Sequence, residues 1–256
     1  GLLFSLPLLE GESEIRLTTK IESKGYIDMT LKTLKTFGIT VTETENGWSI
    51  PGGQKYHGPR MRYAEGDWSN AAFWLVAGAI GGSIGCQGLD MESPQGDRAI
   101  AALLEEFGAE TKVALNQITA THKEMKGIRI DASQIPDLVP ILCVAAAAAE
   151  GKTEIYNAGR LRMKESDRLA VMAECMQKIG VEVEERPDSI IITGGCNPPE
   201  GEIVIDSHND HRIVMAMAIA AVSLGVELTI LGAEAVNKSY PSFFIELAKL
   251  GGVTNV

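Results

Sequence analysis

The feature that most constrains the fold is an internal repeat with a period of about 70 residues. Helical segments that end in glycine recur at LKTFG, LEEFG, MQKIG and LAKLG, and their glycines are Gly38, Gly108, Gly180 and Gly251. A second series of glycines ends small-residue segments at Gly11, Gly81, Gly151 and Gly225. Each glycine suits the left-handed residue that closes a helix. Because the two series alternate, each repeat should contain a helix, a strand, a second helix and two or more short strands.

The two helices of each repeat differ in how much of their surface is apolar. The first helix is apolar nearly all round, as in NAAFWLVAGAI, VPILCVAAAAA and IVMAMAIAAVSL, which predicts burial on every face. The second is amphipathic, as in RAIAALLEEFG and DRLAVMAECMQKIG, and should cover a sheet on one side. ETKVALNQITATHKE and VEVEERPDSIIITGG are typical of strand–turn–strand. We therefore predict an α/β fold in which buried helices are surrounded by repeated sheets.

The repeat indicates that the first copy is incomplete. In the later copies an acidic residue opens the buried helix 14 or 15 positions before the closing glycine. These pairs are Asp67 with Gly81, Asp137 with Gly151, and Asp210 with Gly225. The same offset from Gly11 falls before residue 1. We therefore expect the chain to be the C-terminal piece of a longer protein.

Composition narrows the classes of ligand. The chain has 256 residues, 45% of them apolar, which excludes a disordered protein. Its net charge of −11 argues against binding to nucleic acid or to an anionic membrane, so an anionic ligand needs a local basic cluster. The four cysteines have no zinc, redox or disulfide-framework spacing, which indicates free thiols in a reducing, cytoplasmic setting. No stretch approaches the roughly 20 apolar residues that span a bilayer.

Acidic residues open the buried helices at Asp67, Asp137 and Asp210. Capping of the helix N-terminus is a sufficient explanation for Asp67 and Asp210, because Asp accepts readily from exposed main-chain N–H groups. Asp137 follows Pro136, which suits a first-turn position and not a cap. A chemical role for Asp137 therefore stays open beside a structural one.

Basic residues are expected to open the amphipathic helices. The matched positions hold Lys24, Gln95, Lys164 and Lys238, while Arg168 follows one turn after Lys164 and Arg212 opens a buried helix. The positive end of a helix dipole disfavours a cation by about 0.3–1 kcal/mol. Repeating that cost indicates an anion held there by cations and main-chain N–H groups. Solvated surface lysines are the alternative.

The run from Arg162 to Arg168 is the most densely charged part of the chain. Lys164, Glu165 and Arg168 are predicted to share a helix face, where a carboxylate beside cations suits proton transfer next to an anionic substrate. Exposed ion pairs at a helix start are the alternative. We predict no metal at His208 and His211, since no third ligand stands at a recognisable spacing. Dinucleotide, P-loop, serine-hydrolase and zincin motifs are absent from the sequence.

Five segments together resemble the 5-enolpyruvylshikimate-3-phosphate (EPSP) synthase family: RMKESDRLAVMAECMQKIGVEVEE, NDHRIVMAMAIA, NKSYPSFFIELAKLGG, GDWSNAAFWLVAGAI and SKGYIDMTL. The resemblance implies two domains of three βαβαββ units each, in the inside-out α/β barrel of the enolpyruvyl transferases. Residues 1–62 would be one unit of the incomplete N-terminal-side domain, and 63–256 the three-unit C-terminal-side domain. The family's N-terminal half, with its Gly-rich loop where glyphosate tolerance arises, would lie outside the chain.

The resemblance also implies the reaction and its residues. Asp137 matches the general base that deprotonates the 5-hydroxyl of shikimate-3-phosphate, and Glu165 matches the carboxylate that exchanges protons at the enolpyruvyl methylene. The substrate-binding positions are Arg168, Arg212 and Lys238 for phosphoenolpyruvate, and Ser23, Lys164 and the stacking residue Tyr26 for shikimate-3-phosphate. Phosphate would leave by addition and elimination without a cofactor or metal. Gly25 departs from the pattern, since proline is common there.

Two other functions remain open from the sequence. One is an enolpyruvyl transferase of the same architecture that acts on UDP-N-acetylglucosamine. The other is a non-catalytic half that only binds a complementary fragment. If the chain comes from an EPSP synthase, as the resemblance implies, its partners are phosphoenolpyruvate, shikimate-3-phosphate and the missing N-terminal portion. The intact protein would then be a monomer, and the chain alone would be inactive.

Overall fold

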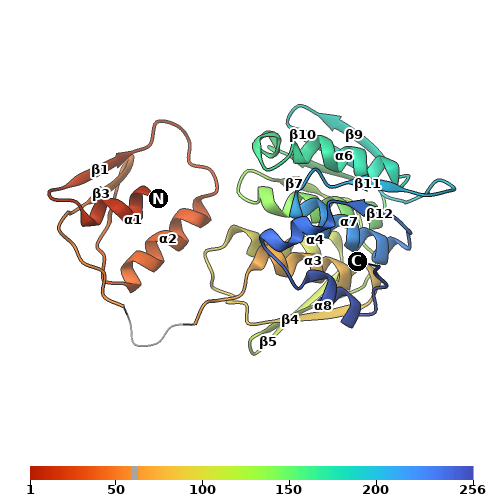
Figure 1. The fold of residues 1–256 in the computed structure, drawn as a ribbon, viewed down its shortest axis with the longest axis horizontal. Coiled ribbons are helices and arrows are strands. Elements are labelled where there is room, and N and C mark those ends of the chain that lie inside the picture. Colours follow the sequence, from red (N-terminus) through yellow and green to blue (C-terminus); the bar gives the residue numbers. More distant parts are fainter. Residues whose placement is uncertain (59–62, 256) are drawn as a thin grey trace. The chain divides into compact units, whose positions relative to one another are not determined.

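The computed structural model describes residues 1–58 and 63–255 and divides into two compact modules (Figure 1). The N-terminal module comprises residues 1–65 and 91–96, and the C-terminal module comprises 66–90 and 97–256. The predicted domain boundary at residue 62 lies outside the described residues. The two modules are described separately.

The N-terminal module is a small sheet with two helices. Its elements are α1 (Leu2–Ser5), η1 (Leu6–Leu8), β1 (Ser13–Arg16), α2 (Lys24–Thr36), β2 (Thr42–Thr44) and β3 (Gly47–Ile50). The sheet order is β1-β3-β2 with antiparallel pairing. Its buried apolar side chains include Leu34 on α2 together with Trp48 and Ile50 on β3.

The core of the C-terminal module consists of three helices that contact one another: α3 (Trp68–Gly81), α5 (Val139–Ala148) and α7 (His211–Leu224). Buried side chains occupy successive positions along each, so no face is left to solvent over most of their length. These are the segments whose composition is apolar all round. The prediction of buried helices is confirmed.

Three sheets accompany these helices in the C-terminal module. Their strands are β4 (Ser83–Gln87), β5 (Glu110–Ala114), β6 (Gln117–Thr121), β7 (Arg129–Asp131), β8 (Lys152–Tyr156), β9 (Glu182–Arg186), β10 (Ser189–Thr193), β11 (Val204–Asp206) and β12 (Thr229–Leu231). The sheet orders are β4-β6-β5, β7-β8-β10-β9 and β11-β12. The β5–β6 and β9–β10 hairpins fall where the sequence predicts them.

Each amphipathic helix of this module follows a 3-10 turn. The helices are α4 (Ile100–Phe107), α6 (Arg168–Lys178) and α8 (Phe243–Lys249), and the turns are η2 (Gly96–Ala99), η4 (Gly159–Met163) and η5 (Ala233–Lys238). A further 3-10 turn, η3 (Pro136–Leu138), leads into α5. In Figure 1 the buried helices together with α4 and α6 lie against strands of their own repeats, whereas α8 lies near β4 of an earlier repeat.

Seven of the eight glycines have the expected positive φ. Five of them lie at the ends of helices, but Gly11 and Gly151 close none, because the helical segments before them end at Leu8 and Ala148. The glycines with positive φ are Gly11, Gly38, Gly108, Gly151, Gly180, Gly225 and Gly251. The prediction is wrong for Gly81, which is the last residue of α3 and has no positive φ, and the cap residue Gly82 is extended with φ 170°. The helix α3 therefore runs one residue further toward strand β4 than the glycine pattern predicts.

Two negative predictions can be compared with the described residues. No helix among them is long and apolar enough to cross a bilayer. The four cysteines are free thiols, and burial raises the pKa of the Cys86 thiol to about 11.

Candidate active site

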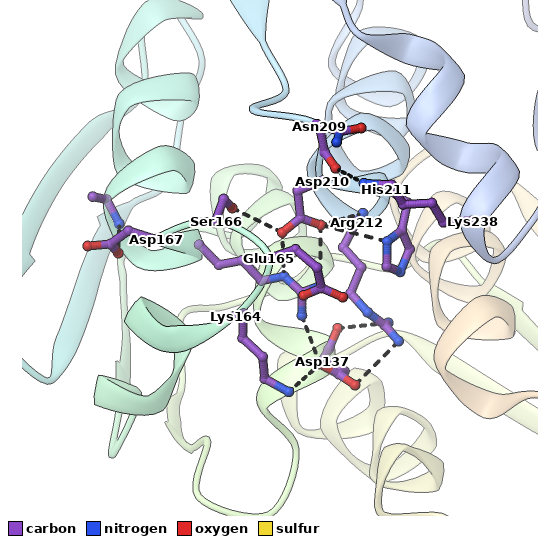
Figure 2. Close-up of polar contacts among 12 residues, drawn as sticks. Asp137, Lys164, Glu165, Ser166, Asp167, Asn209, Asp210, His211, Arg212 and Lys238 are labelled. Carbon is purple, nitrogen blue, oxygen red and sulfur yellow. Dashed lines mark hydrogen bonds and ion pairs between the residues drawn. The ribbon is translucent and has the colours of Figure 1, made fainter.

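Asp137 lies in η3, immediately before the buried helix α5, and contacts two cations of its own repeat, Lys164 and Arg168, and one of the next repeat, Arg212 (Figure 2). Its Oδ1 is 3.2 Å from Lys164 Nζ and 2.9 Å from Arg168 Nη1. Its Oδ2 is 3.4 Å from Arg212 Nη2, and its main-chain oxygen accepts from Arg212 Nη1 at 3.2 Å. The caps of η3 and α5 do not use the Asp137 side chain, and its carboxylate contacts these three cations.

The charge state of Asp137 follows from this crowding. Burial raises the pKa of its carboxyl, but Arg212, Lys164 and Arg168 together outweigh burial and lower it to about 2. Asp137 is therefore an ionised carboxylate at neutral pH. It is a poor base as long as the three cations remain beside it.

Arg168 is the centre of the cluster. Its side chain is 1% exposed, and its Nε lies 2.7 Å from Asp210 Oδ2 while its Nη2 lies 2.6 Å from Glu165 Oε2. Burial works against the charge, but the bond to Asp210 and the fields of Glu165 and Asp137 raise the pKa of the guanidinium. A buried charge with this many partners is fixed in position.

Asp210 has two structural duties. It caps α7 by accepting from the Arg212 main-chain N–H at 2.9 Å, as the capping interpretation predicts. It also accepts hydrogen bonds from Ser166 Oγ at 3.0 Å and from Arg168. Burial raises the pKa of the Asp210 carboxyl, but these contacts outweigh burial and lower it. Asp67 caps α3 by accepting from the Ser69 N–H at 2.8 Å, so capping accounts for it as well.

The placement expected for two of the lysines is wrong. Lys164 follows η4 and Lys238 ends η5, whereas the α-helices begin only at Arg168 and Phe243. These lysines therefore stand at the carbonyl ends of short 3-10 turns and do not oppose a helix dipole. The sequence pattern does not distinguish such a turn from the helix that follows it. Support for an anion site comes instead from the convergence of the cations.

Lys24 does open α2 as predicted, and it pairs with Asp28 at 2.6 Å. Lys164, Glu165 and Arg168 do not share a helix face, because residues 164–167 precede α6. The turn nevertheless brings all three side chains into one cluster. Their predicted proximity is correct and its predicted cause is not.

Glu165 and Lys238 lie at the edges of the cluster. The Glu165 side chain is 45% exposed, so solvent and ligands reach it. Lys238 Nζ donates to the main-chain oxygen of Asn209, next to Asp210 (Figure 2). The cluster thus comprises four cationic side chains and three carboxylates, and three of the cations contact those carboxylates. This gathers basic residues in a chain of net charge −11.

Ser23 and Tyr26 belong to the N-terminal module and are described within it. Ser23 precedes α2 with a left-handed φ of 50°, and Tyr26 lies in the first turn with 43% of its surface exposed. A Cβ on Gly25 would lie 2.5 Å from the Pro94 oxygen. The segment at 94–96 therefore excludes the proline common in the family at this position.

Two residues beside the cluster, Asp97 and His211, were not among the site residues predicted from the sequence. Asp97, 3% exposed, accepts from Ser69 Oγ in the first turn of α3. Burial raises the pKa of Asp97 to about 6, although Ser69 and Arg212 favour the charged form. His211 has a buried Nδ1 with no hydrogen-bond partner among the described residues, and burial together with Arg212 lowers its pKa. The Asp-Arg pair at 97–98, repeated at 167–168, is the sequence signal for Asp97.

A hollow of about 460 Å³ lies elsewhere in this module, between α3, β4 and α8. Trp74, Tyr240 and Leu250 line it, and none of the seven clustered residues of the C-terminal module does. Among the described residues, no group of His, Cys, Asp and Glu side chains is arranged to hold a metal ion.

Solved enolpyruvyl transferases share this architecture. The structure of EPSP synthase from Acinetobacter baumannii superposes with a TM-score of 0.78 at 30% identity, over 99% of this chain and 59% of that one. The enolpyruvyl transferase NikO from Streptomyces tendae gives a TM-score of 0.75 at 20% identity over 98% of this chain and 58% of that one, a likeness of fold alone. The fold class is that of the enolpyruvyl transferases, as the sequence predicts.

Sequence comparison defines the family within that class. The profile of EPSP synthase (3-phosphoshikimate 1-carboxyvinyltransferase) matches residues 1–247. The 3-phosphoshikimate 1-carboxyvinyltransferases of Clostridium acetobutylicum and Clostridium novyi are 49% and 44% identical over 98% and 99% of this chain. The chain belongs to the EPSP synthase family. It spans 58% of the length of each of these two relatives.

Proposed function

We propose that the protein to which this chain belongs transfers the enolpyruvyl group of phosphoenolpyruvate to the 5-hydroxyl of shikimate-3-phosphate and releases phosphate. This is a step of the shikimate pathway to aromatic amino acids. The observation that carries the proposal is the convergence of Lys164, Arg168 and Arg212 on Asp137. Membership of the EPSP synthase family favours this acceptor over a UDP-sugar.

The cations bind the two anionic substrates in this proposal. Arg168, Arg212 and Lys238 hold phosphoenolpyruvate, for which the planar guanidinium groups suit bidentate contacts with carboxylate or phosphate oxygens. Lys164 contacts shikimate-3-phosphate, together with Ser23 and the ring of Tyr26. The substrates bring negative charge that the site otherwise receives from its own carboxylates.

Asp137 acts as the general base. With its cations in place it is a weak base, because Arg212, Lys164 and Arg168 overcome burial and hold its pKa at about 2. Substrate anions that share those cations weaken their hold, which raises the pKa of the carboxyl and makes it basic when the hydroxyl is present. The hydroxyl oxygen then attacks C2 of phosphoenolpyruvate.

Glu165 handles the proton at C3. It is held by Arg168 at 2.6 Å and is half exposed, so it is fixed in position and still accessible. Protonation of C3 accompanies the attack at C2, and loss of a proton from C3 accompanies departure of phosphate. The surrounding cations stabilise the charge on the departing phosphate, and no cofactor is proposed.

The partner in this proposal is the N-terminal portion of the same protein, which completes the active site, and the intact enzyme works as a cytoplasmic monomer. The chain alone is inactive. Steady-state phosphate release, measured for the chain, for the N-terminal portion and for their mixture, tests this. Only the mixture should turn over, and only with shikimate-3-phosphate as acceptor.

A matched pair of variants locates the chemistry. In the reconstituted mixture, Asp137→Asn should lower kcat by at least about 100-fold, since it removes the general base. Asp188→Asn, outside the cluster, should leave kcat unchanged. Turnover by the chain alone, or with UDP-N-acetylglucosamine as acceptor, would contradict the proposal.

A further inference from the structure

The turn that leads into α7 has an unusual main-chain conformation. Its two central residues, His208 and Asn209, both have a left-handed φ, of 49° and 56°. The Asp210 N–H donates to the Ser207 oxygen at 3.0 Å, so residues 207–210 form a hydrogen-bonded turn with the two positive φ values of type I′. This conformation is strained for residues with a side chain. Among the residues that the structure describes, no other adjacent pair without glycine has two positive φ values.

The turn that leads toward α5 makes the same bonds. β7–β8 and β11–β12 share one parallel register, which sets residues 132–135 in the position of 207–210. In each turn the first N–H donates to the last residue of the second strand, at 2.9 Å and 3.2 Å, and the fourth N–H donates to the first oxygen, at 3.1 Å and 3.0 Å. The second N–H donates to the aspartate that ends the first strand, at 2.9 Å and 2.8 Å. The donors are Ala132, Ile135 and Ser133 in one turn and Ser207, Asp210 and His208 in the other.

The two turns differ in the main-chain conformation at their centres. Ser133 and Gln134 have no positive φ, whereas His208 and Asn209 are both left-handed. The bonds of the turn form in either conformation, so they do not require the strained one. Strained residues persist where their surroundings hold them, and they gather at functional sites. The strain at 208–209 therefore has to be explained by a contact outside the turn.

That contact is the bond from Lys238 to the Asn209 main-chain oxygen (Figure 2). A turn with two positive φ values is the mirror image of the ordinary turn, so its central carbonyls point to the opposite face. In the preceding repeat the lysine that follows η4, Lys164, lies 3.2 Å from the carboxylate of Asp137 instead. The left-handed turn thus occurs in the copy whose lysine is held by a main-chain carbonyl.

The same turn is attached to both ends of η5. Before its first residue, the Gly232 oxygen accepts from Ser207 Oγ at 3.2 Å, and Ser207 is 0% exposed. At its last residue, Lys238 bonds to Asn209. A Cβ on Gly232 would lie 2.7 Å from Ser207 Oγ, so the approach of η5 to the turn is close. The position of the ammonium group therefore follows from the conformation of the turn.

The turn also holds the two arginines of the cluster. Its fourth residue, Asp210, accepts from Arg168 Nε at 2.7 Å and from the Arg212 main-chain N–H at 2.9 Å. A buried carboxylate thus fixes Arg168 and the start of the helix that carries Arg212. Lys238 is exposed, so burial does not fix its side chain. Its contact with the turn is a single carbonyl, whose direction depends on the two left-handed residues.

We propose that Asn209 is a positioning residue for Lys238, whose ammonium group its left-handed main chain holds at the edge of the cluster to bind phosphoenolpyruvate. The inference rests on the proposed function, which assigns Lys238 to that substrate. Asn suits the position, because it adopts left-handed conformations more readily than most residues with a side chain. The main-chain oxygen acts here, and the amide side chain is dispensable.

Substitutions that differ in their tolerance of a positive φ test the inference. Asn209→Gly accepts a left-handed conformation without strain, Asn209→Ala accepts it less readily, and Asn209→Val least of all, because valine is β-branched. All three keep the main-chain oxygen and remove the amide. Gln134→Val is the matched control, since Gln134 holds the same place in the turn without a positive φ.

The first measurement uses the chain alone and needs no turnover. Acetylation by acetic anhydride, read by mass spectrometry after digestion, reports how readily each lysine amine loses its proton. The rate at Lys238 should be unchanged in Asn209→Gly and should rise at least about threefold in Asn209→Val, because an ammonium group that loses its acceptor deprotonates more readily. Lys249, which pairs with Glu246 at 2.9 Å, is the internal control. Equal rates at Lys238 in the glycine and valine variants would overturn the inference.

The alanine variant protects this test against a failure to fold. Asn209→Ala disfavours the positive φ at a smaller steric cost than valine, so its rate at Lys238 should lie between those of the glycine and valine variants. If Asn209→Val does not fold, a rate in Asn209→Ala equal to that in Asn209→Gly overturns the inference by itself. Gln134→Val should leave the rate at Lys238 unchanged.

The second measurement is steady-state kinetics of the chain mixed with the N-terminal portion. Asn209→Val should raise KM for phosphoenolpyruvate at least about fivefold and change kcat by less than about twofold, because it weakens binding of one substrate. Asn209→Gly and Gln134→Val should keep the unaltered KM. In a Lys238→Met background, Asn209→Val should raise KM no further, since it acts through that lysine. A further rise in that background would contradict the inference.

The outcome is separable from that of the proposed function. Faster acetylation of Lys238 in Asn209→Val, without turnover in any mixture, would support the positioning role and contradict the enzyme assignment. Turnover in the mixture, with the same KM for phosphoenolpyruvate in the glycine and valine variants, would support the assignment and overturn the positioning role.

Discussion

At the scale of single residues, the candidate site is a balance of opposite charges in which two aspartates have opposite perturbations. Asp137 is held as a strongly acidic carboxyl by three cations, with a pKa of about 2. Asp97 is buried beside a single serine hydroxyl, and burial lifts its pKa to about 6. The number of cations in contact with each carboxylate decides whether its pKa is lowered or raised. Only structure reveals that number, since both residues read as aspartate near a helix start.

Asp97 should make stability fall as the pH rises. Its pKa lies near 3.8 when unfolded and near 6 when folded, so the folded state holds the proton more tightly. Between about pH 4 and pH 6 the free energy of unfolding should fall by up to about 3 kcal/mol on this account. Asp97→Asn should remove that fall. Urea denaturation at pH 4.5 and 7.5 measures it, with the exposed Glu200→Gln as the control, and an unaltered slope in Asp97→Asn would refute the account.

Removal of Arg168 should be far more damaging than removal of a surface arginine. Arg168→Met leaves Asp210, 0% exposed, without its guanidinium and should cost about 3–5 kcal/mol in the free energy of unfolding. Arg129→Met breaks an ion pair whose arginine is 69% exposed and should cost less than about 1 kcal/mol. If urea denaturation gave the same loss of unfolding free energy for Arg168→Met and Arg129→Met, this account of the buried ion pair would be wrong.

At the scale of elements, the sequence predicts most of what is local. Buried helices, amphipathic helices and the two hairpins follow from apolar periodicity, which acts within a single segment. The 3-10 turns before α4, α6 and α8 were not predicted, because their composition resembles that of the helices they precede. The contact of Ser69 with Asp97 was missed too, since it joins residues 28 apart in sequence.

The cap of α3 should contribute measurably to stability. Asp67→Ala removes an acceptor for the main-chain N–H groups of Ser69 and Asn70 and should lower the free energy of unfolding by about 0.5–2 kcal/mol. Asp67→Asn keeps an acceptor and should lose less. Thermal unfolding of the three proteins would decide, and the reverse order of stabilities would exclude capping as the role of Asp67.

At the scale of the whole chain, the two modules have unequal cores. The C-terminal module buries three apolar helices, whereas the N-terminal module leaves Leu2 64%, Leu8 56% and Leu9 52% exposed. Ser23 and Tyr26 of this module are proposed substrate positions that came from family resemblance alone, because no spacing connects them to the cluster. Sequence could therefore predict the architecture and most of the clustered residues, but not how the charges pair.

The N-terminal module of the isolated chain should open first. In dilute urea, peptides covering residues 26–50 should exchange amide hydrogens before peptides covering 139–148, because fewer buried contacts oppose their opening. Exchange read by mass spectrometry checks the order. Simultaneous exchange of both regions would show that the modules unfold as one cooperative body.

The register shared by β7–β8 and β11–β12 has a consequence for how opposite charges meet. It sets equivalent residues 75 apart, as in Arg129 with Val204 and Glu154 with Thr229, and the same interval separates Asp137 from Arg212. A duplicated scaffold with identical side chains would bring like charges together there and repel itself. Asp137 and Arg212 instead carry opposite charges, so the contact between the two copies is attractive, at 3.4 Å.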